Sequence, residues 1–215
     1  DWCPLCDPGM YCDAPGLLQP RAPCDPGYIC VLGASTSGPI DGVTGELCPA
    51  GGYCPLGSYV ALPCPMGTYS NATGAVNQYD CFDCDAGYYC SSVAGGQPTG
   101  LCWGGYYCTG AAKTLRQNFT EPGYYAPNGS VAPVECEIGF YNPYYTMSEC
   151  LECEPGFYCN EKAMTDHIAC PAGSYCGNGT YVPELCPPGT FSNRTHLETI
   201  DQCDDCPAGK DCPER

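Results

Sequence analysis

The chain has 215 residues, among them 23 cysteines, 28 glycines and 23 prolines, and its formal net charge is −17. Leu, Ile, Val and Phe together supply only 30 residues, too few for an ordinary aliphatic core. The cysteine content indicates that disulfide cross-links replace this core, and it requires an oxidising compartment. The excess of acidic residues argues against nucleic acid and anionic membranes as partners.

The compartment is therefore predicted to be extracellular, either secreted or at the cell surface. Neither a signal peptide nor a membrane-spanning run is visible, and the chain starts at Asp1 without Met, so we expect a processed product or a segment of something longer, without direct membrane insertion. N-linked glycans are expected on the five acceptor tripeptides. The acceptors are Asn71, Asn118, Asn128, Asn178 and Asn193.

A seven-residue motif recurs twelve times: Cys, two residues, Gly, one residue, an aromatic residue, and often a second Cys. The fourth position is Gly in all twelve repeats, and the sixth is aromatic in all but two, which carry Ile29 and Asp211. The repeats, numbered 1 to 12 below, begin at Cys6, Cys24, Cys48, Cys64, Cys84, Cys102, Thr120, Cys136, Cys153, Cys170, Cys186 and Cys206.

Each repeat predicts a tight turn that leads into a short strand. Pro or Asp before Gly is typical of a turn in which Gly supplies a positive φ, and the following aromatic residue favours a strand and is expected to cover a disulfide. No stretch shows sustained helical periodicity. The predicted fold is therefore small and disulfide-rich: an elongated rod of tandem cysteine-rich modules with short β-hairpins and turns and little or no helix.

The cysteines also show a longer period, because two six-cysteine runs with similar spacings begin at Cys64 and Cys136. We expect an N-terminal module lacking its first cysteine, plus one extra repeat, over residues 1–63. A six-cysteine module plus a repeat that lacks cysteine covers residues 64–135, a six-cysteine module alone covers 136–185, and an incomplete C-terminal module covers 186–215.

The motifs resemble those of the ephrin-receptor-like cysteine-rich repeat family. The resemblance lies in Cys64-Pro-Met-Gly-Thr-Tyr69 with Cys81-Phe-Asp-Cys84, and in Cys186-Pro-Pro-Gly-Thr-Phe191 with Cys203-Asp-Asp-Cys206. The six-cysteine order is also similar to that of tumour-necrosis-factor-receptor and EGF-like modules. This resemblance implies that the first cysteine of a module joins the second, the third joins the fifth, and the fourth joins the sixth. The implied pairs are Cys64–Cys81, Cys84–Cys102, Cys90–Cys108, Cys136–Cys150, Cys153–Cys170, Cys159–Cys176, Cys186–Cys203, Cys6–Cys24 and Cys12–Cys30.

One further pair follows from the chain itself. Repeat 7 has Thr120 and Ala126 where other repeats have their two cysteines, and loss of both together indicates that these positions are partners. We therefore predict a local Cys48–Cys54 bridge. Cys3, Cys206 and Cys212 remain, and we expect their partners beyond this segment; alternatively, Cys206 and Cys212 close locally and Cys3 bonds to another molecule.

The sequence offers no expected catalytic group or metal site, so we predict that the chain is not an enzyme. The Cys-x-x-Cys pairs are interpreted as structural, and His167 and His196 stand in no catalytic or metal-binding spacing. Calcium is the one cofactor considered besides glycans, and it is not expected, because neither acidic cluster has the spacing of a calcium loop. The clusters are Asp80, Asp83 and Asp85, and Asp201, Asp204 and Asp205.

Two functional hypotheses follow. Repeats that contact mainly their neighbours are typical of quasi-one-dimensional structures, which favours a structural subunit or segment of an extracellular glycoprotein filament, surface fibre, coat or matrix, whose partners are other copies of itself or adjoining repeats. The alternative is a ligand-binding or adhesion ectodomain of a cell-surface receptor. Modules of this kind serve both roles, so the repeat alone does not decide between them.

Overall fold

The computed structural model describes residues 5–210 and Cys212. This part of the chain forms eleven two-stranded antiparallel sheets and two short 3-10 turns, η1 (Gln78–Asp80) and η2 (Ile200–Gln202). The predicted small disulfide-rich fold, with short hairpins and little helix, is confirmed. Cys3 and Asp211, which entered the sequence argument, lie outside the described residues.

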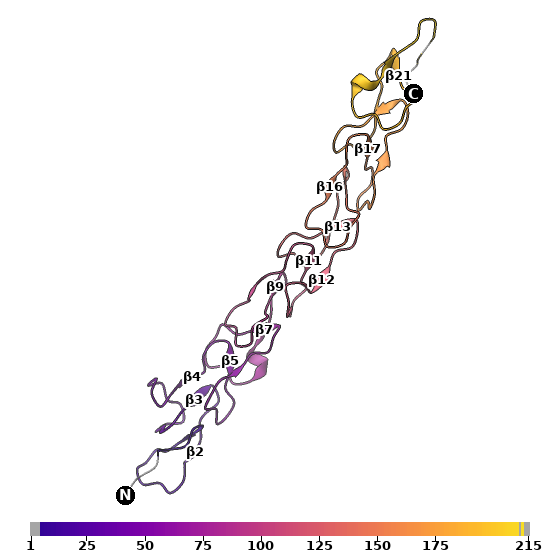
Figure 1. Ribbon diagram of the computed structural model, residues 1–215. Helices are drawn as coiled ribbons and strands as arrows, with labels where there is room; N and C mark the ends of the chain where they lie inside the picture. The colour runs from indigo at the N-terminus through magenta and orange to yellow at the C-terminus, as the bar shows by residue number, and fades with distance from the viewer. Residues whose placement is uncertain (1–4, 211, 213–215) are drawn as a thin grey trace. The chain divides into compact units, whose positions relative to one another are not determined.

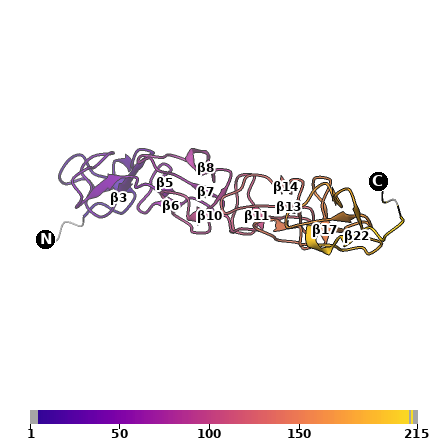
Figure 2. The same cartoon turned by 90° about the horizontal axis from the view of Figure 1, so that it is seen from above.

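The chain divides into two compact bodies. The N-terminal body comprises Asp1–Cys102 and Cys108–Gln117, and the C-terminal body comprises Trp103–Tyr107 and Asn118–Arg215. Within each body the hairpins follow one another in chain order, as two views of the ribbon show (Figures 1 and 2).

The strands pair in sequence order in both bodies. The N-terminal hairpins are β1 (Met10–Tyr11) with β2 (Ala22–Pro23), β3 (Tyr28–Cys30) with β4 (Gly45–Leu47), β5 (Gly52–Tyr53) with β6 (Leu62–Pro63), β7 (Thr68–Tyr69) with β8 (Phe82–Asp83), and β9 (Tyr88–Tyr89) with β10 (Gly100–Leu101). The C-terminal hairpins are β11 (Tyr106–Tyr107) with β12 (Asn118–Phe119), β13 (Tyr124–Tyr125) with β14 (Val134–Glu135), β15 (Phe140–Tyr141) with β16 (Leu151–Glu152), β17 (Phe157–Tyr158) with β18 (Ile168–Ala169), β19 (Ser174–Tyr175) with β20 (Glu184–Leu185), and β21 (Thr190–Phe191) with β22 (Asp204–Asp205).

Repeats 1 to 11 each contribute a tight turn and the strand that follows it. In repeat 1 the amide of Met10 donates to the carbonyl of Asp7 (3.1 Å), and Gly9 occupies the third turn position with a φ of 80°. A positive φ at that position defines a type II turn, which explains the glycine. The strand then pairs with the residues just before the next repeat, as Tyr11 does with Ala22. The predicted turn-to-strand unit is therefore present.

Successive repeats are joined by a ladder of backbone hydrogen bonds. In repeats 2 to 12 the first residue donates to the motif glycine of the repeat before, and in repeats 1 to 9 the motif glycine donates to the seventh residue of the next repeat. In repeats 1 to 5 and 7 to 10, two further bonds connect the seventh and first residues to the loop of the next repeat. Between repeats 2 and 3 these bonds run from Cys48 to Gly27 (2.8 Å), from Gly27 to Cys54 (2.8 Å), from Cys30 to Ser58 (3.0 Å) and from Gly57 to Cys24 (2.9 Å).

One loop residue in each of repeats 2 to 11 adopts a left-handed backbone, and we call it the left-handed loop residue. In repeats 2 to 6 and 8 to 11 its amide donates to the first residue of the preceding repeat, as Ala111 does to Cys84 (2.8 Å). In repeats 3 to 6 and 8 to 11 its carbonyl approaches the motif glycine two repeats earlier; a Cβ on Gly67 would stand 2.8 Å from the Ala111 oxygen. In repeats 2 to 11 these residues are Gly33, Gly57, Gly74, Ala94, Ala111, Gly129, Thr146, Ala163, Gly179 and His196.

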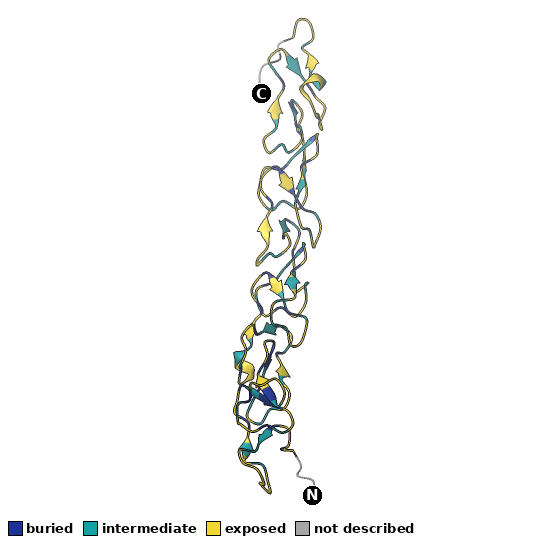
Figure 3. Cartoon of the chain, turned by 90° about the vertical axis from the view of Figure 1, so that its left-hand side faces the viewer, coloured by how far each residue is buried: buried dark blue, intermediate teal, exposed yellow. Residues whose placement is uncertain are grey.

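The buried interior consists mainly of disulfides and small side chains rather than aliphatic residues. Tyr11 packs on the buried Cys24 and Cys30, and Tyr89 packs on Cys102 and Cys108 in the same way. The aromatic residue of one repeat thus covers the disulfide of the next. The sequence predicted that it covers a disulfide but did not say which one. Figure 3 shows the result: buried residues form short stretches, while most strands are intermediate or exposed.

Candidate functional site: the disulfide ladder and its surface

Eleven disulfides join all the cysteines that the structure describes, and eight of them lie inside a single repeat, between its first and seventh positions. In these repeats the type II turn brings the two positions together, with Cα atoms 5.8 Å apart for Cys6 and Cys12. That separation lies within the range a disulfide requires. The local bridges are Cys6–Cys12, Cys24–Cys30, Cys48–Cys54, Cys84–Cys90, Cys102–Cys108, Cys153–Cys159, Cys170–Cys176 and Cys206–Cys212.

Six pairs implied by the resemblance are therefore wrong. They are Cys6–Cys24, Cys12–Cys30, Cys84–Cys102, Cys90–Cys108, Cys153–Cys170 and Cys159–Cys176. The physical reason is that backbone hydrogen bonds, rather than disulfides, connect neighbouring repeats, while each turn folds its own two cysteines onto one another. Cys206 and Cys212, expected to find partners elsewhere or to close locally, close locally.

The other three bridges span longer loops and agree with the prediction. They are Cys64–Cys81, Cys136–Cys150 and Cys186–Cys203, and the local Cys48–Cys54 bridge is also confirmed. In the three long-bridge repeats the seventh position holds Ser70, Asn142 or Ser192, each buried. A first-position cysteine thus bonds to position seven where that is cysteine, and otherwise to the cysteine three residues before the next repeat.

Repeat 7 has no disulfide, and hydrogen bonds hold its first position instead. Thr120 is completely buried, and its hydroxyl donates to the carbonyl of Gly105 (3.2 Å). Ala126, at the seventh position, is also buried. The fold therefore tolerates the loss of a bridge where a buried hydroxyl occupies the place of the sulfur and makes a hydrogen bond.

Four of the five predicted glycan acceptors are exposed: Asn71, Asn128, Asn178 and Asn193. Each precedes a left-handed loop residue by one or three positions, so the acceptors share one region of the repeat. The fifth, Asn118, is half-buried in β12, and its side-chain amide donates to the carbonyl of Tyr107 (3.3 Å). Glycan attachment at the five positions stays a prediction.

The two histidines belong to a ring column in the C-terminal body. The ring of Phe157 contacts His167 (centroids 3.9 Å apart) and His196 (4.9 Å), and His167 also contacts Tyr141 (5.0 Å). Neither histidine faces a cysteine thiol, because every described cysteine is bridged. Their observed contacts are those of packing residues.

Members of the acidic clusters considered for calcium make separate local hydrogen bonds and ion pairs. The carboxylate of Asp80 accepts hydrogen bonds from the amides of Val76 (2.7 Å) and Asn77 (3.0 Å) and so caps η1. Asp85 accepts from the Tyr69 hydroxyl (3.1 Å), which raises the pKa of that phenol, and Asp204 lies 3.5 Å from Arg194. Within the described residues, no group of three or more His, Cys, Asp or Glu side chains is placed to hold a metal ion.

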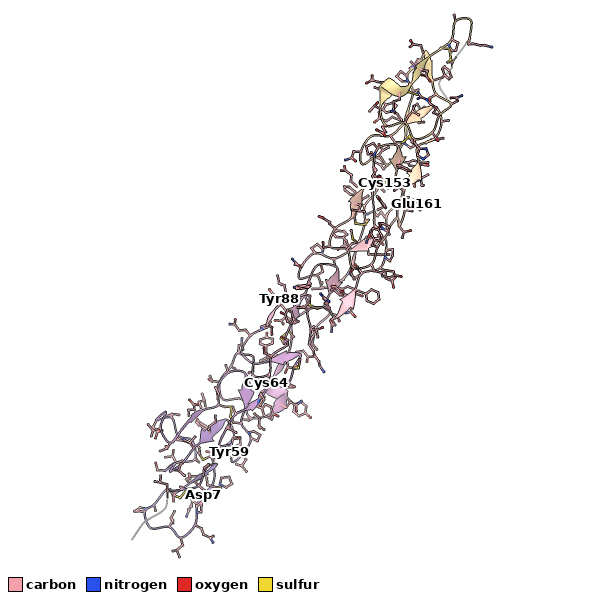
Figure 4. All side chains as sticks on the ribbon, viewed as in Figure 1. Asp7, Tyr59, Cys64, Tyr88, Cys153 and Glu161 are labelled. Carbon is pink, nitrogen blue, oxygen red and sulfur yellow. A yellow bond between two sulfur atoms is a disulfide. The ribbon has the colours of Figure 1, made fainter. Side chains whose placement is uncertain are left out.

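Sequence reasoning missed the left-handed loop residues and the close approaches that they make. Half of those positions are occupied by Gly, which is a sequence signal, but alanine, threonine and histidine at the others conceal it. Figure 4 labels Cys64 and Cys153, the first residues of a long-bridge and a local-bridge repeat, which share the same ladder of backbone bonds.

The fold and the bridges define a class: a small disulfide-rich protein built from tandem single-turn repeats. No family model and no curated protein matches the chain. The ephrin-receptor-like resemblance therefore stays a prediction. Between residues 5 and 210, no helical segment has the length and apolarity needed to cross a membrane.

Proposed function

We propose that this chain is a structural subunit or segment of an extracellular glycoprotein filament, surface fibre, coat or matrix. The observation that carries the proposal is the ladder itself, in which the same backbone hydrogen bonds recur between most successive repeats. Such a fold gains length by adding repeats and needs no larger core as it grows. Disulfides inside the repeats supply stability that scarce aliphatic side chains do not.

The surface supports the same proposal. Four exposed acceptors lie at related loop positions, so glycans attached there would recur along the chain. An extracellular location accounts for eleven bridges in a chain of this size. We also propose that the chain has no catalytic role: its described cysteines are bonded to one another, and its two histidines pack against Phe157.

One loop favours the alternative of a ligand-binding or adhesion ectodomain. Between β3 and β4, the carboxylate of Asp41 accepts hydrogen bonds from the amides of Val43 (2.8 Å) and Thr44 (2.7 Å). This ordered loop holds Ile40 and Val43 almost fully in solvent, 79% and 78% exposed. Apolar side chains that gather on one exposed loop are a feature of contact surfaces when they form a contiguous patch.

Electron microscopy of the native material distinguishes the two proposals. Regular fibres with a fixed subunit repeat, labelled by an antibody against this chain, are expected for a filament component. The structural proposal would be overturned in favour of the ectodomain if the material consisted of dispersed single particles at physiological salt and the antibody labelled only the cell surface.

A further inference from the structure

Tyr79 is by far the most exposed tyrosine that the structure describes. Its side chain is 95% exposed, against 63% for Tyr144, the next most exposed. It lies in the middle of η1, the 3-10 turn in the long loop of repeat 4. A large aromatic side chain left this far in water gains nothing for folding, because burial is the source of its stabilising energy.

The turn beneath Tyr79 is rigid. The side chain of Asn77 accepts from the Tyr79 amide (2.8 Å), and the Asp80 carboxylate closes the reciprocal half of a capping box. The residue after Asp80 is Cys81, which is bonded to Cys64. The exposed ring is thus held out on a turn that two caps and a disulfide fix in place.

The chain contains its own control for what this turn requires. Repeat 11 builds the same kind of turn: the side chain of Gln202 in η2 accepts from the Glu198 amide (2.6 Å), and the following Cys203 is bonded to Cys186 across the same sequence separation as in repeat 4. At the place equivalent to Tyr79, repeat 11 has Asp201, which is also exposed. The turn therefore folds without an aromatic residue, and the Tyr79 ring is free for another task.

The phenol of Tyr79 also differs from others in the chain. The hydroxyls of Tyr69 and Tyr175 donate to Asp85 (3.1 Å) and Glu184 (2.5 Å), and these bonds raise the pKa of both phenols. No described residue makes such a bond with Tyr79, so its hydroxyl faces water. Every described cysteine is bridged, so this part of the chain has no free thiol to quench a phenoxyl radical.

We propose that Tyr79 is a site of oxidative coupling between two copies of this chain, an inference that rests on the proposed assembly role. A peroxidase with hydrogen peroxide takes one electron and one proton from each of two phenols, and the peroxide is reduced to two waters. The two phenoxyl radicals join through ring carbons ortho to the oxygens. The ring hydrogens then move to the oxygens, which leaves two phenols linked by one new carbon–carbon bond.

Charge sets the conditions for this coupling. Each chain carries a net charge of −17, and Asp80 and Asp83 stand close to Tyr79 in sequence, so two copies repel one another at low ionic strength. Salt at physiological concentration screens charges beyond about 8 Å. The yield of coupled dimer should therefore rise with ionic strength, a dependence that coupling between uncharged surfaces would not show.

The test treats the purified full chain with a haem peroxidase and hydrogen peroxide. Dimers that survive reduction are counted on a gel, and cross-linked peptides are identified by mass spectrometry. Dimer carrying the Tyr79–Tyr79 link is expected; Tyr79→Phe should lose most of it, and Tyr144→Phe should keep it. Undiminished dimer from Tyr79→Phe, or cross-linked peptides that lack Tyr79, would overturn the proposal.

Repeat 11 provides a gain-of-function arm. Tyr79→Phe combined with Asp201→Tyr should restore dimers, now linked through position 201, because the scaffold is the same. Asp201→Tyr alone should yield larger multimers, since each chain then has two coupling sites. Failure of coupling with regular fibres still visible by microscopy would reject this inference alone, whereas coupled dimers without native fibres would reject the filament proposal alone.

Discussion

The motif glycine Gly139 lies against the backbone carbonyl of Gly179, two repeats further along the chain. A Cβ on Gly139 would stand 2.6 Å from that oxygen, and the φ of Gly139 is 85°. Two constraints therefore fall on one residue: the turn needs a left-handed backbone, and the following repeats need the space that a side chain would fill. Together they explain why this position is glycine.

Gly139→Ala and Gly173→Ala separate these two constraints. Gly173 has the same place in its repeat and a φ of 83°, but no atom lies within 4 Å of the point where a Cβ would stand. Gly173→Ala should cost about 1 kcal/mol for the left-handed backbone alone. Gly139→Ala should cost roughly 2 kcal/mol more, because the neighbouring carbonyl must move. Urea denaturation followed by tyrosine fluorescence measures both, and equal costs would contradict the close-approach account.

Thr146 is the least suitable side chain at a left-handed loop position, because it is β-branched and its φ is 61°. Thr146→Gly should raise the free energy of unfolding by up to about 1 kcal/mol, even though glycine increases the freedom of the unfolded chain. Thr165→Gly, at an exposed position without positive φ, is the control and should lower it by about 0.4–1 kcal/mol. Stabilisation in both variants, or in neither, would show that backbone strain at Thr146 is not the cause.

Repeat 7 should accept the disulfide that it lacks. The double variant Thr120→Cys with Ala126→Cys places cysteines at the first and seventh positions, whose Cα atoms in bridged repeats are about 6 Å apart. The new bridge should add about 2 kcal/mol, the loop-entropy value for so short a ring. Because Thr120 belongs to the Asn118 acceptor, the reference protein should carry Asn118→Gln. A free-thiol assay and thermal unfolding measure the outcome; two persistent thiols would show that repeat 7 departs from the common geometry.

Acid should open the loop that Asp41 organises. Hydrogen bonds from the Thr44 hydroxyl and the Val43 and Thr44 amides lower the pKa of the Asp41 carboxyl from 3.8 to about 2. Because the folded pKa is depressed, its contribution to loop stability is fully present above the ordinary value and is lost as the pH falls through about 2. Amide hydrogen exchange at Val43, Thr44 and Gly45, followed by NMR, should accelerate as the pH falls through about 2. Asp41→Asn should remove this pH dependence, and unchanged protection well below pH 2 would contradict it.

The fold could be predicted from the sequence because its determinants are local. Gly9 and its eleven equivalents mark a turn, and the aromatic residue that follows marks a strand, so each hairpin was readable from a few residues. The approach of the Ala111 carbonyl to Gly67 was not readable, because it joins residues far apart along the chain through a backbone atom that carries no residue-type signal.

The local disulfide pairs could be predicted from residue patterns within this chain but not from the resemblance to receptor modules. The joint loss of cysteine at Thr120 and Ala126 correctly indicated a bridge between positions one and seven, and it led to Cys48–Cys54. The same spacing recurs at Cys84 and Cys90, but there the receptor-like resemblance implied bridges between repeats. Those bridges would duplicate a connection that the backbone ladder already makes, as the Cys102 amide does with Gly87 (3.0 Å).

The most direct test of the repeat architecture is the disulfide map of the native protein. Proteolysis without reduction, followed by mass spectrometry, should recover Cys84 linked to Cys90 and Cys102 linked to Cys108, together with the longer Cys64–Cys81 bridge. Peptides joining Cys84 to Cys102 and Cys90 to Cys108 would contradict the account, because repeats would then be held together by disulfides rather than by backbone hydrogen bonds.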